Sequence, residues 1–183
     1  MKLPELLAPA GSWENLVTAV KSGADAVYFG VKELNMRATA NNFELEELGN
    51  VVDYCKKNNI KSYLTVNTII YEHELDKVKK ILVEAKRAKI DAIICWDFSV
   101  IQTCKNLKLP FHVSTQASVS NSVSAKFFEK QGASRIILAR ECSLDQIKDI
   151  RLKTDIDLEV FIHGAMCVAV SGRCFISQFL NCK

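Results

Sequence analysis

Short apolar runs alternate with longer amphipathic segments along most of this chain of 183 residues. Apolar runs of strand length recur at residues 6–8, 26–29, 62–66, 92–96, 111–115, 135–139 and 158–162. Helical patterns fill the intervals, over residues 12–21, 44–57, 72–89, 99–107 and 122–131 and again from residue 143. Strands that are separated by helices predict parallel βαβ units, so the pattern indicates an α/β protein.

The number of strands and one missing motif select between two α/β architectures. The chain lacks the glycine-rich fingerprint of dinucleotide-binding folds, which favours a (β/α)8 TIM-type barrel over a doubly wound sheet. A complete barrel has eight strands and typically about 250 residues, whereas seven strands are predicted here. We therefore expect one domain over residues 1–183, an incomplete barrel with a cysteine-bearing loop at residues 163–183.

Local signals mark several helix ends. Ser12 is a typical N-cap for the first helix, and Gly132 is a typical residue just beyond the C-terminus of the fifth. Ser143 and Gln146 have the spacing of a capping box, which predicts that a helix begins there.

The helix over residues 72–89 is strongly amphipathic, with Leu75, Val78, Leu82 and Ala85 on one face. Elsewhere it is rich in basic side chains: Lys77, Lys79, Lys80, Lys86, Arg87 and Lys89. These form either a solvated outer face, supported by an Asp76–Lys80 pair, or a phosphate-binding patch.

Composition and net charge are compatible with an anionic partner but do not identify the function. A net charge of +3 and a pI of about 8.4 permit an RNA or another anionic partner. We find neither a signal peptide nor a stretch long enough to span a bilayer, so we expect a cytoplasmic protein with reduced cysteines.

Cys55, Cys95 and Cys104 lie in predicted helices or strands and are expected to be small buried side chains. Cys142 follows a predicted strand and is also expected to be structural.

Polar side chains follow most predicted strands, where parallel α/β proteins gather their chemistry. The residues in these positions are Tyr28, Gly30, Asn67, Trp96, Asp97, Ser114, Gln116, Arg140, Glu141 and His163. Each either contributes to a common site or caps its own loop, and Asp97 before Ser99 is the clearest cap. Zinc-protease, serine-hydrolase and Walker motifs are absent from the sequence. Ser171 is a conceivable nucleophile, but no adjacent base is identifiable.

The segment from Glu159 to Ser177 contains the strongest candidate site. His163 follows the last predicted strand, and beyond it Cys167 and Cys174 are separated by six residues. Small or polar residues between the cysteines favour an exposed turn. Imidazole and thiolate ligands suit zinc or an iron–sulfur cluster, and the spacing alone does not separate the two.

This segment also resembles the signature of a known family, the collagenase-like peptidases of peptidase family U32. The matching positions are Glu159, Phe161, Gly164, Ala165, Cys167, Gly172, Cys174 and Ser177. Residues 4–12 and 23–30 are similar to the start of the family, so the resemblance covers essentially the whole chain. Residues 113–117, 140–141 and 143–144 look most like the branch that hydroxylates RNA bases, including a tRNA wobble uridine.

The resemblance implies an enzyme that works without molecular oxygen, with prephenate as the apparent hydroxyl source and a 4Fe–4S cluster bound by four cysteines. Cys167 and Cys174 would be the first two cluster ligands, because thiolates are the donors that such clusters use. The side chains expected to act in catalysis are His163, Gln116, Arg140 and Glu141. The implied partner is tRNA or another RNA, whose target base leaves its stack to reach the site.

Family members continue with two further cysteines and an eighth strand, whereas this sequence ends at Lys183. Cys182 follows Cys174 too closely to replace the third ligand, so half of the ligand set is expected here. An incomplete barrel leaves unpaired strand edges, and we expect self-association or binding of a partner segment through them. The alternatives to a hydroxylase are a collagenase-like protease, the family's historical label, and an inactive or accessory fragment.

Overall fold

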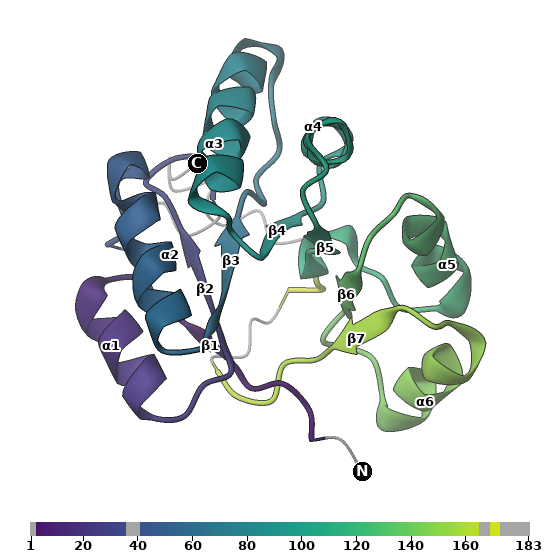
Figure 1. Ribbon diagram of the computed structural model, residues 1–183. Coiled ribbons are helices and arrows are strands. Elements are labelled where there is room, and N and C mark those ends of the chain that lie inside the picture. Colours follow the sequence, from purple (N-terminus) through teal and green to yellow (C-terminus); the bar gives the residue numbers. More distant parts are fainter. Residues whose placement is uncertain (1–2, 36–40, 165–168, 173–183) are drawn as a thin grey trace. The chain divides into compact units, whose positions relative to one another are not determined.

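The computed structural model describes residues 3–35, 41–164 and 169–172. Within them, seven strands alternate with helices in the order expected from the sequence (Figure 1). The chain forms two compact units, Met1–Leu109 and Pro110–Lys183, and each is described in turn.

The first unit contains four parallel strands that pair in chain order. They are β1 (Leu7–Pro9), β2 (Ala26–Gly30), β3 (Lys61–Thr65) and β4 (Ala92–Cys95). In the register, Tyr28 lies opposite Tyr63, and Leu64 lies opposite Ile93. β3 pairs on both sides and is buried at every position after Lys61, as expected for an inner strand of a parallel sheet.

A helix follows each strand of the first unit. These helices are α1 (Trp13–Lys21), α2 (Leu48–Lys57), α3 (Leu75–Ala88) and α4 (Phe98–Leu107). Ser12 caps α1, as predicted. The helices predicted from residues 44 and 72 begin instead with 3-10 turns, η1 (Leu45–Glu47) and η2 (Glu72–Glu74). In each turn, the side chain of the last glutamate accepts a hydrogen bond from the backbone N–H of the residue that precedes the turn. Glu47 accepts from Glu44 at 2.8 Å, and Glu74 accepts from Tyr71 at 3.0 Å.

The helix α3 confirms most of its predicted buried face. Val78, Leu82 and Ala85 are buried, whereas Leu75 is 38% exposed because it is the first residue of the helix. The predicted basic face is exposed to solvent, and on it Lys77 pairs with Glu33 at 2.8 Å. This exposure agrees with a solvated outer face, and phosphate binding there stays a prediction.

The second unit contains three parallel strands with two helices. The strands are β5 (Phe111–Val113), β6 (Arg135–Ile137) and β7 (Asp157–Glu159), and the helices are α5 (Ser122–Lys130) and α6 (Leu144–Lys153). Gly132 follows α5 with φ of 93°, and Ser143 and Gln146 form the predicted capping box at α6. β5 ends earlier than predicted because Ser114 caps a 3-10 turn, η3 (Thr115–Ala117).

The prediction of a buried seventh strand over residues 158–162 is wrong beyond Glu159. Val160, Phe161 and Ile162 are 43%, 51% and 81% exposed. The last backbone bond to β6 runs from the Leu138 N–H to the Glu159 carbonyl at 2.9 Å, and no further residue continues this ladder in the described chain. An apolar run forms a strand only where a neighbouring strand pairs with it, and the apolar run 158–162 continues beyond the last residue that pairs with β6.

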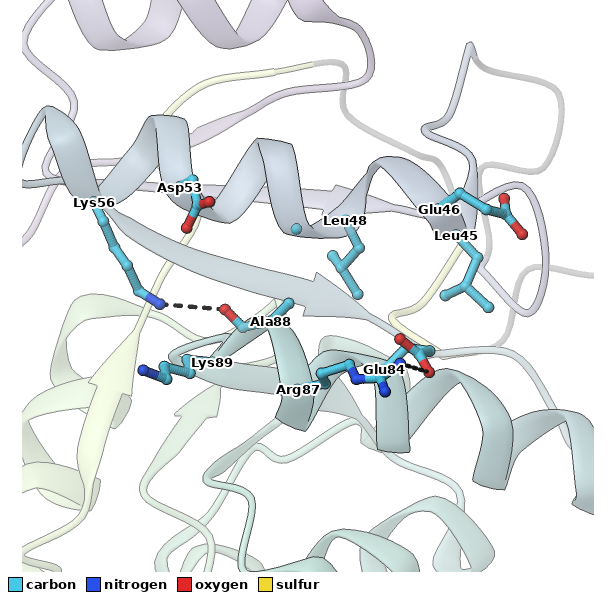
Figure 2. Close-up of a pocket in the computed structure, with 10 residues that line it drawn as sticks. Leu45, Glu46, Leu48, Asp53, Lys56, Glu84, Arg87, Ala88 and Lys89 are labelled. Carbon is cyan, nitrogen blue, oxygen red and sulfur yellow. Dashed lines mark hydrogen bonds and ion pairs between the residues drawn. The ribbon is translucent and has the colours of Figure 1, made fainter.

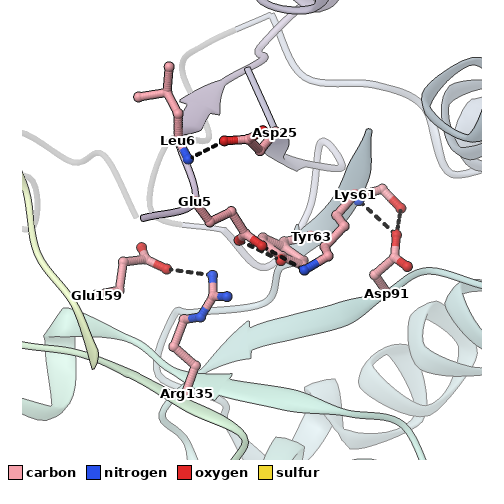
Figure 3. Close-up of polar contacts among 9 residues, drawn as sticks. Glu5, Leu6, Asp25, Lys61, Tyr63, Asp91, Arg135 and Glu159 are labelled. Atoms are coloured by element: carbon pink, nitrogen blue, oxygen red, sulfur yellow. Dashed lines mark hydrogen bonds and ion pairs between the residues drawn. The ribbon is translucent and has the colours of Figure 1, made fainter. Parts of the chain in front are cut away.

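Polar contacts link neighbouring strands within each unit (Figure 3). In the first unit, Glu5 accepts from Lys61 Nζ at 2.6 Å and from the Tyr63 hydroxyl at 2.8 Å. In the second unit, Arg135 of β6 pairs with Glu159 of β7 at 3.3 Å. Glu5 and Lys61 lie at the N-terminal end of β1 and β3, the end that contributes stability in TIM-type folds, while chemistry lies at the C-terminal end. None of the helices in the described part of the chain is long and apolar enough to span a membrane.

Candidate functional site

The C-terminal ends of β5 and β6 hold three of the four residues that were expected to act in catalysis. Gln116 lies in the turn η3 that follows β5, and Arg140 and Glu141 follow β6. Ser114 donates from Oγ to Gln116 Oε1 at 2.9 Å, which orients the half-buried amide. The parallel pairing of β5 with β6 brings these two loops to one edge of the sheet.

A turn at Ser171 and Gly172 packs against both loops. Ser171 Oγ accepts from the Arg140 backbone N–H at 3.1 Å and from Arg140 Nε at 3.3 Å. The Ser171 backbone N–H donates to Glu141 Oε1, and Ser118 Oγ donates to the Ser171 carbonyl. Arg140 Nη2 also reaches the Ala169 carbonyl at 3.3 Å. The segment 169–172, which lies between the two cysteines in the sequence, is therefore anchored to the ends of β5 and β6.

Gly172 allows the close approach of this turn. Its φ is 74°, in the left-handed region that favours glycine. A Cβ atom at this position would lie 2.6 Å from Ser118 Oγ and closer still to the Gln116 carbonyl oxygen. A side chain would clash with backbone, so the sequence Ser171-Gly172 is suited to this packing.

The anchored turn argues against Ser171 as a nucleophile. The residue is 2% exposed, and its hydroxyl oxygen already accepts two hydrogen bonds from Arg140. Glu141 accepts from the Ser171 backbone N–H, and the described contacts include no histidine at this serine. The sequence pattern did not predict this structural role of Ser171, and the following glycine was the one local signal of a tight turn.

The remaining predicted site residues are not brought into this arrangement by any described contact. His163 is exposed, and Cys167 and Cys174 lie outside the described residues. Among the residues that are described, no three histidine, cysteine, aspartate or glutamate side chains cluster as a metal site would require. The expected ligand role of the two cysteines therefore stays a prediction.

In the first unit, two of the polar residues at strand ends join adjacent loops. Trp96 Nε1 donates to the Asn67 carbonyl at 2.9 Å, which ties the loop after β4 to the loop after β3. Asp97 caps α4 as predicted, accepting from the Ser99 backbone N–H at 2.8 Å. Its other oxygen accepts from the Ile70 backbone N–H at 3.2 Å, a second bond between the same loops.

Replacing Asp97 with alanine is expected to lower the free energy of unfolding by about 1–2 kcal/mol, because both the cap and the bond to Ile70 are lost. Asp97→Asn is the matched control, since its carbonyl oxygen still caps α4 while its NH2 group cannot accept from Ile70. Urea unfolding followed by circular dichroism should place Asn between wild type and alanine. Equal stability of the alanine variant and wild type would contradict this role.

The buried cysteines are confirmed as structural. Cys55, Cys95 and Cys104 are fully buried free thiols. Burial raises the pKa of Cys55 to about 11, and contact with Cys104 together with burial raises that of Cys95. Burial also raises the pKa of the half-buried Cys142. The raised pKa values keep the thiols of Cys55, Cys95 and Cys142 protonated at neutral pH, whereas metal ligands and nucleophiles are thiolates.

A groove of about 420 Å³ lies between α2 and α3 in the first unit (Figure 2). Lys56 Nζ donates across it to the Ala88 carbonyl at 3.2 Å, and Arg87 pairs with Glu84 at 3.4 Å on its α3 wall. Its charged groups have both signs, and none of the residues predicted at strand ends lines it. We assign no function to this groove.

Comparison with known proteins extends these observations. The model of peptidase family U32 matches residues 11–183. The chain is 50% identical to an uncharacterized protease of Methanocaldococcus jannaschii, covering 98% of the chain and 45% of that protein. It is 41% identical to tRNA hydroxylation protein P1 of Bacillus subtilis, covering 100% of the chain and 44% of the relative. It is 40% identical to a collagenase of Porphyromonas gingivalis, covering 94% and 44%. The chain thus spans less than half the length of these relatives.

A solved structure supports the fold. The structure of a U32 peptidase aligns with a TM-score of 0.70 at 18% identity, covering 87% of this chain and 69% of the other. Together with the seven parallel strands, this confirms the predicted fold class, an incomplete TIM-type α/β fold.

Proposed function

Because the chain belongs to peptidase family U32, we propose that it forms part of a cytoplasmic enzyme of this family that hydroxylates the wobble uridine of tRNA. The structural observation that carries the proposal is the anchored segment 169–172, which lies in sequence between two cysteines suited to a cluster. Identity of 41% to a tRNA hydroxylation protein over the whole chain supports the substrate class.

Cys167 and Cys174 are the residues that would hold a 4Fe–4S cluster in this proposal. The donor chemistry fits, because cysteine thiolates are the usual ligands of such clusters. An anchored turn between the two donors also fits, because hydrogen bonds that restrain a ligand loop orient the ligands. A bound cluster would supply redox chemistry, with prephenate as the source of the hydroxyl group. In this chain, Cys167 and Cys174 would supply two ligands of the cluster.

We assign substrate contact to Gln116 and His163. Gln116 lies at the C-terminal end of β5 with its amide held by Ser114, so its NH2 group is oriented before substrate arrives. His163 is exposed and precedes Cys167 by four positions in the sequence. A uridine must leave its stack before its ring carbons become accessible, and amide and imidazole groups bind the edges of such extruded bases.

A collagenase-like protease is the second candidate, favoured by the 40% identity to a protein named collagenase. A protease needs an activated nucleophile or a catalytic metal site, and the described residues provide little support for either. Ser171 is buried, and its hydroxyl oxygen accepts hydrogen bonds from Arg140. Glu141 binds the backbone N–H of Ser171. Three-residue metal clusters are also absent from residues 3–35, 41–164 and 169–172. Peptide hydrolysis that persists after replacement of both Cys167 and Cys174 would favour the protease.

The proposal is tested by nucleoside mass spectrometry of tRNA from cells that lack the gene. We expect 5-hydroxyuridine-derived nucleosides to disappear in the deletion strain. Their restoration by this chain alone would show that 183 residues suffice. Restoration only by the chain with a separate partner segment would assign it an accessory role within the same enzyme. Unchanged tRNA nucleosides would contradict the wobble-uridine assignment.

A further inference from the structure

The backbone N–H, the carbonyl and the hydroxyl oxygen of Ser171 are each bound by a residue from another loop. Its N–H donates to Glu141, its hydroxyl oxygen accepts twice from Arg140, and its carbonyl accepts from Ser118. Two of these partners carry full charges of opposite sign and are adjacent in the sequence. The residues on either side of Ser171 are the apolar Val170 and the small Gly172.

We propose that Arg140 and Glu141 are positioning residues that hold the turn at Ser171 and Gly172, which lies in the sequence between Cys167 and Cys174. They would then act through the turn rather than on substrate, in contrast to the catalytic role expected from the sequence. The consequence for the cysteines rests on the proposed function, but the holding of the turn does not.

The hydrogen-bonding capacity of both side chains supports this role. The Arg140 side chain uses Nε for Ser171 Oγ at 3.3 Å and Nη2 for the Ala169 carbonyl at 3.3 Å, so it spans two residues of the segment. Arg140 contributes its backbone N–H to the same hydroxyl at 3.1 Å. Hydrogen bonds to charged groups are stronger than neutral ones, and here they converge on a residue that is 2% exposed.

The charge state of Glu141 is also that of a hydrogen-bond acceptor. The bond from the Ser171 backbone N–H is the main cause that lowers the pKa of Glu141 below its ordinary value of 4.5. A general acid or base is most effective when its pKa lies near the working pH, which this shift opposes. The carboxylate therefore stays ionised at neutral pH, and the contribution of this bond is lost only as pH falls through the lowered pKa.

Two substitutions of Glu141 separate positioning from proton transfer. Glu141→Gln keeps a side-chain oxygen that accepts from the Ser171 N–H, whereas Glu141→Ala removes the acceptor. We expect amide hydrogen exchange in the peptide containing residues 169–172 to accelerate roughly 10- to 100-fold in Glu141→Ala, the effect of losing a hydrogen bond to a charged group. Glu141→Gln should stay much closer to wild type, within roughly tenfold.

Exchange of the β6 strand, Arg135–Ile137, serves as the internal control for folding of the second unit. Ser118→Ala is a milder variant that removes only one neutral donor, and roughly a 2- to 10-fold acceleration in the same peptide is expected. Unprotected exchange of the peptide in the wild-type chain would overturn the proposal. Equal rates in the wild type, Glu141→Ala and Ser118→Ala would overturn it as well.

The exchange measurement uses the metal-free chain without RNA, so its outcome does not depend on the proposed function. Nucleoside levels in cells that carry the same substitutions add the second readout. If positioning is the role, Glu141→Gln should restore in part the modified nucleoside that is lost in Glu141→Ala. If tRNA proves not to be the substrate while exchange behaves as expected, the function fails and the positioning role stands. Equal loss of modification in both variants, with slow exchange in Glu141→Gln, would make Glu141 catalytic and overturn the proposal.

Discussion

Replacing Leu64 with alanine is expected to lower the free energy of unfolding of the first unit by about 3 kcal/mol, within the range of large-to-small substitutions in cores. Leu64 is 0% exposed and lies in β3, between Phe29 of β2 and Ile93 of β4 in the register. Strands on both sides restrain the backbone, so the cavity cannot collapse easily. Both the lost burial and the remaining cavity therefore contribute to the cost.

Tryptophan fluorescence during urea unfolding measures this effect in the correct unit, because Trp13 and Trp96, the two tryptophans of the chain, both belong to it. The unfolding midpoint should fall by about 1 M or more. Leu3→Ala is the matched control, since Leu3 is 86% exposed and its truncation should change stability by less than about 0.5 kcal/mol. If the two variants had similar midpoints, the placement of Leu64 in the core would be wrong.

Replacing Cys174 with alanine in the chromosomal gene is expected to reduce tRNA hydroxylation by roughly 100-fold or more, because a cluster ligand is lost under the proposed function. The chromosomal substitution tests the protein in whatever length the cell produces. Nucleoside mass spectrometry gives the modification level, and iron content of the purified protein gives an independent readout. Both should fall together.

Cys142→Ala provides the matched control for this experiment. Its thiol is half-buried in the loop between β6 and α6, and burial raises its pKa, which disfavours the thiolate that a ligand requires. We expect modification and iron content close to wild type. Retention of both in the Cys174 variant would remove the cysteine from the ligand set and leave the cofactor proposal without its main residue.

Local patterns were sufficient to predict most of the fold. The alternation of apolar and amphipathic segments predicted seven strands in the observed order, and side-chain capping at Ser12, Asp97 and Ser143 was predicted correctly. Each of these features depends on residues within about one helical turn or one strand period of each other. The family signature is likewise contiguous in sequence, so its residues could be recognised from their order and spacing alone.

Features that depend on distant partners were predicted poorly. The last strand was expected to continue to Ile162, but its pairing stops at Glu159, because strand length is set by the neighbour as well as by the apolar run. Arg140 and Glu141 were identified as site residues, while their contacts with Ser171 were not. Those contacts span 31 and 30 residues of sequence, and the one from Ser118 spans 53.

The sequence by itself thus determined the strand–helix order, the helix caps, the family and the two cysteines of interest. Only the tertiary structure decided what surrounds Ser171, because hydrogen bonds between loops form where the parallel strands β5 and β6 bring their ends together. Sequence spacing carries no information about such contacts, since the path of the intervening helices sets the distance between them.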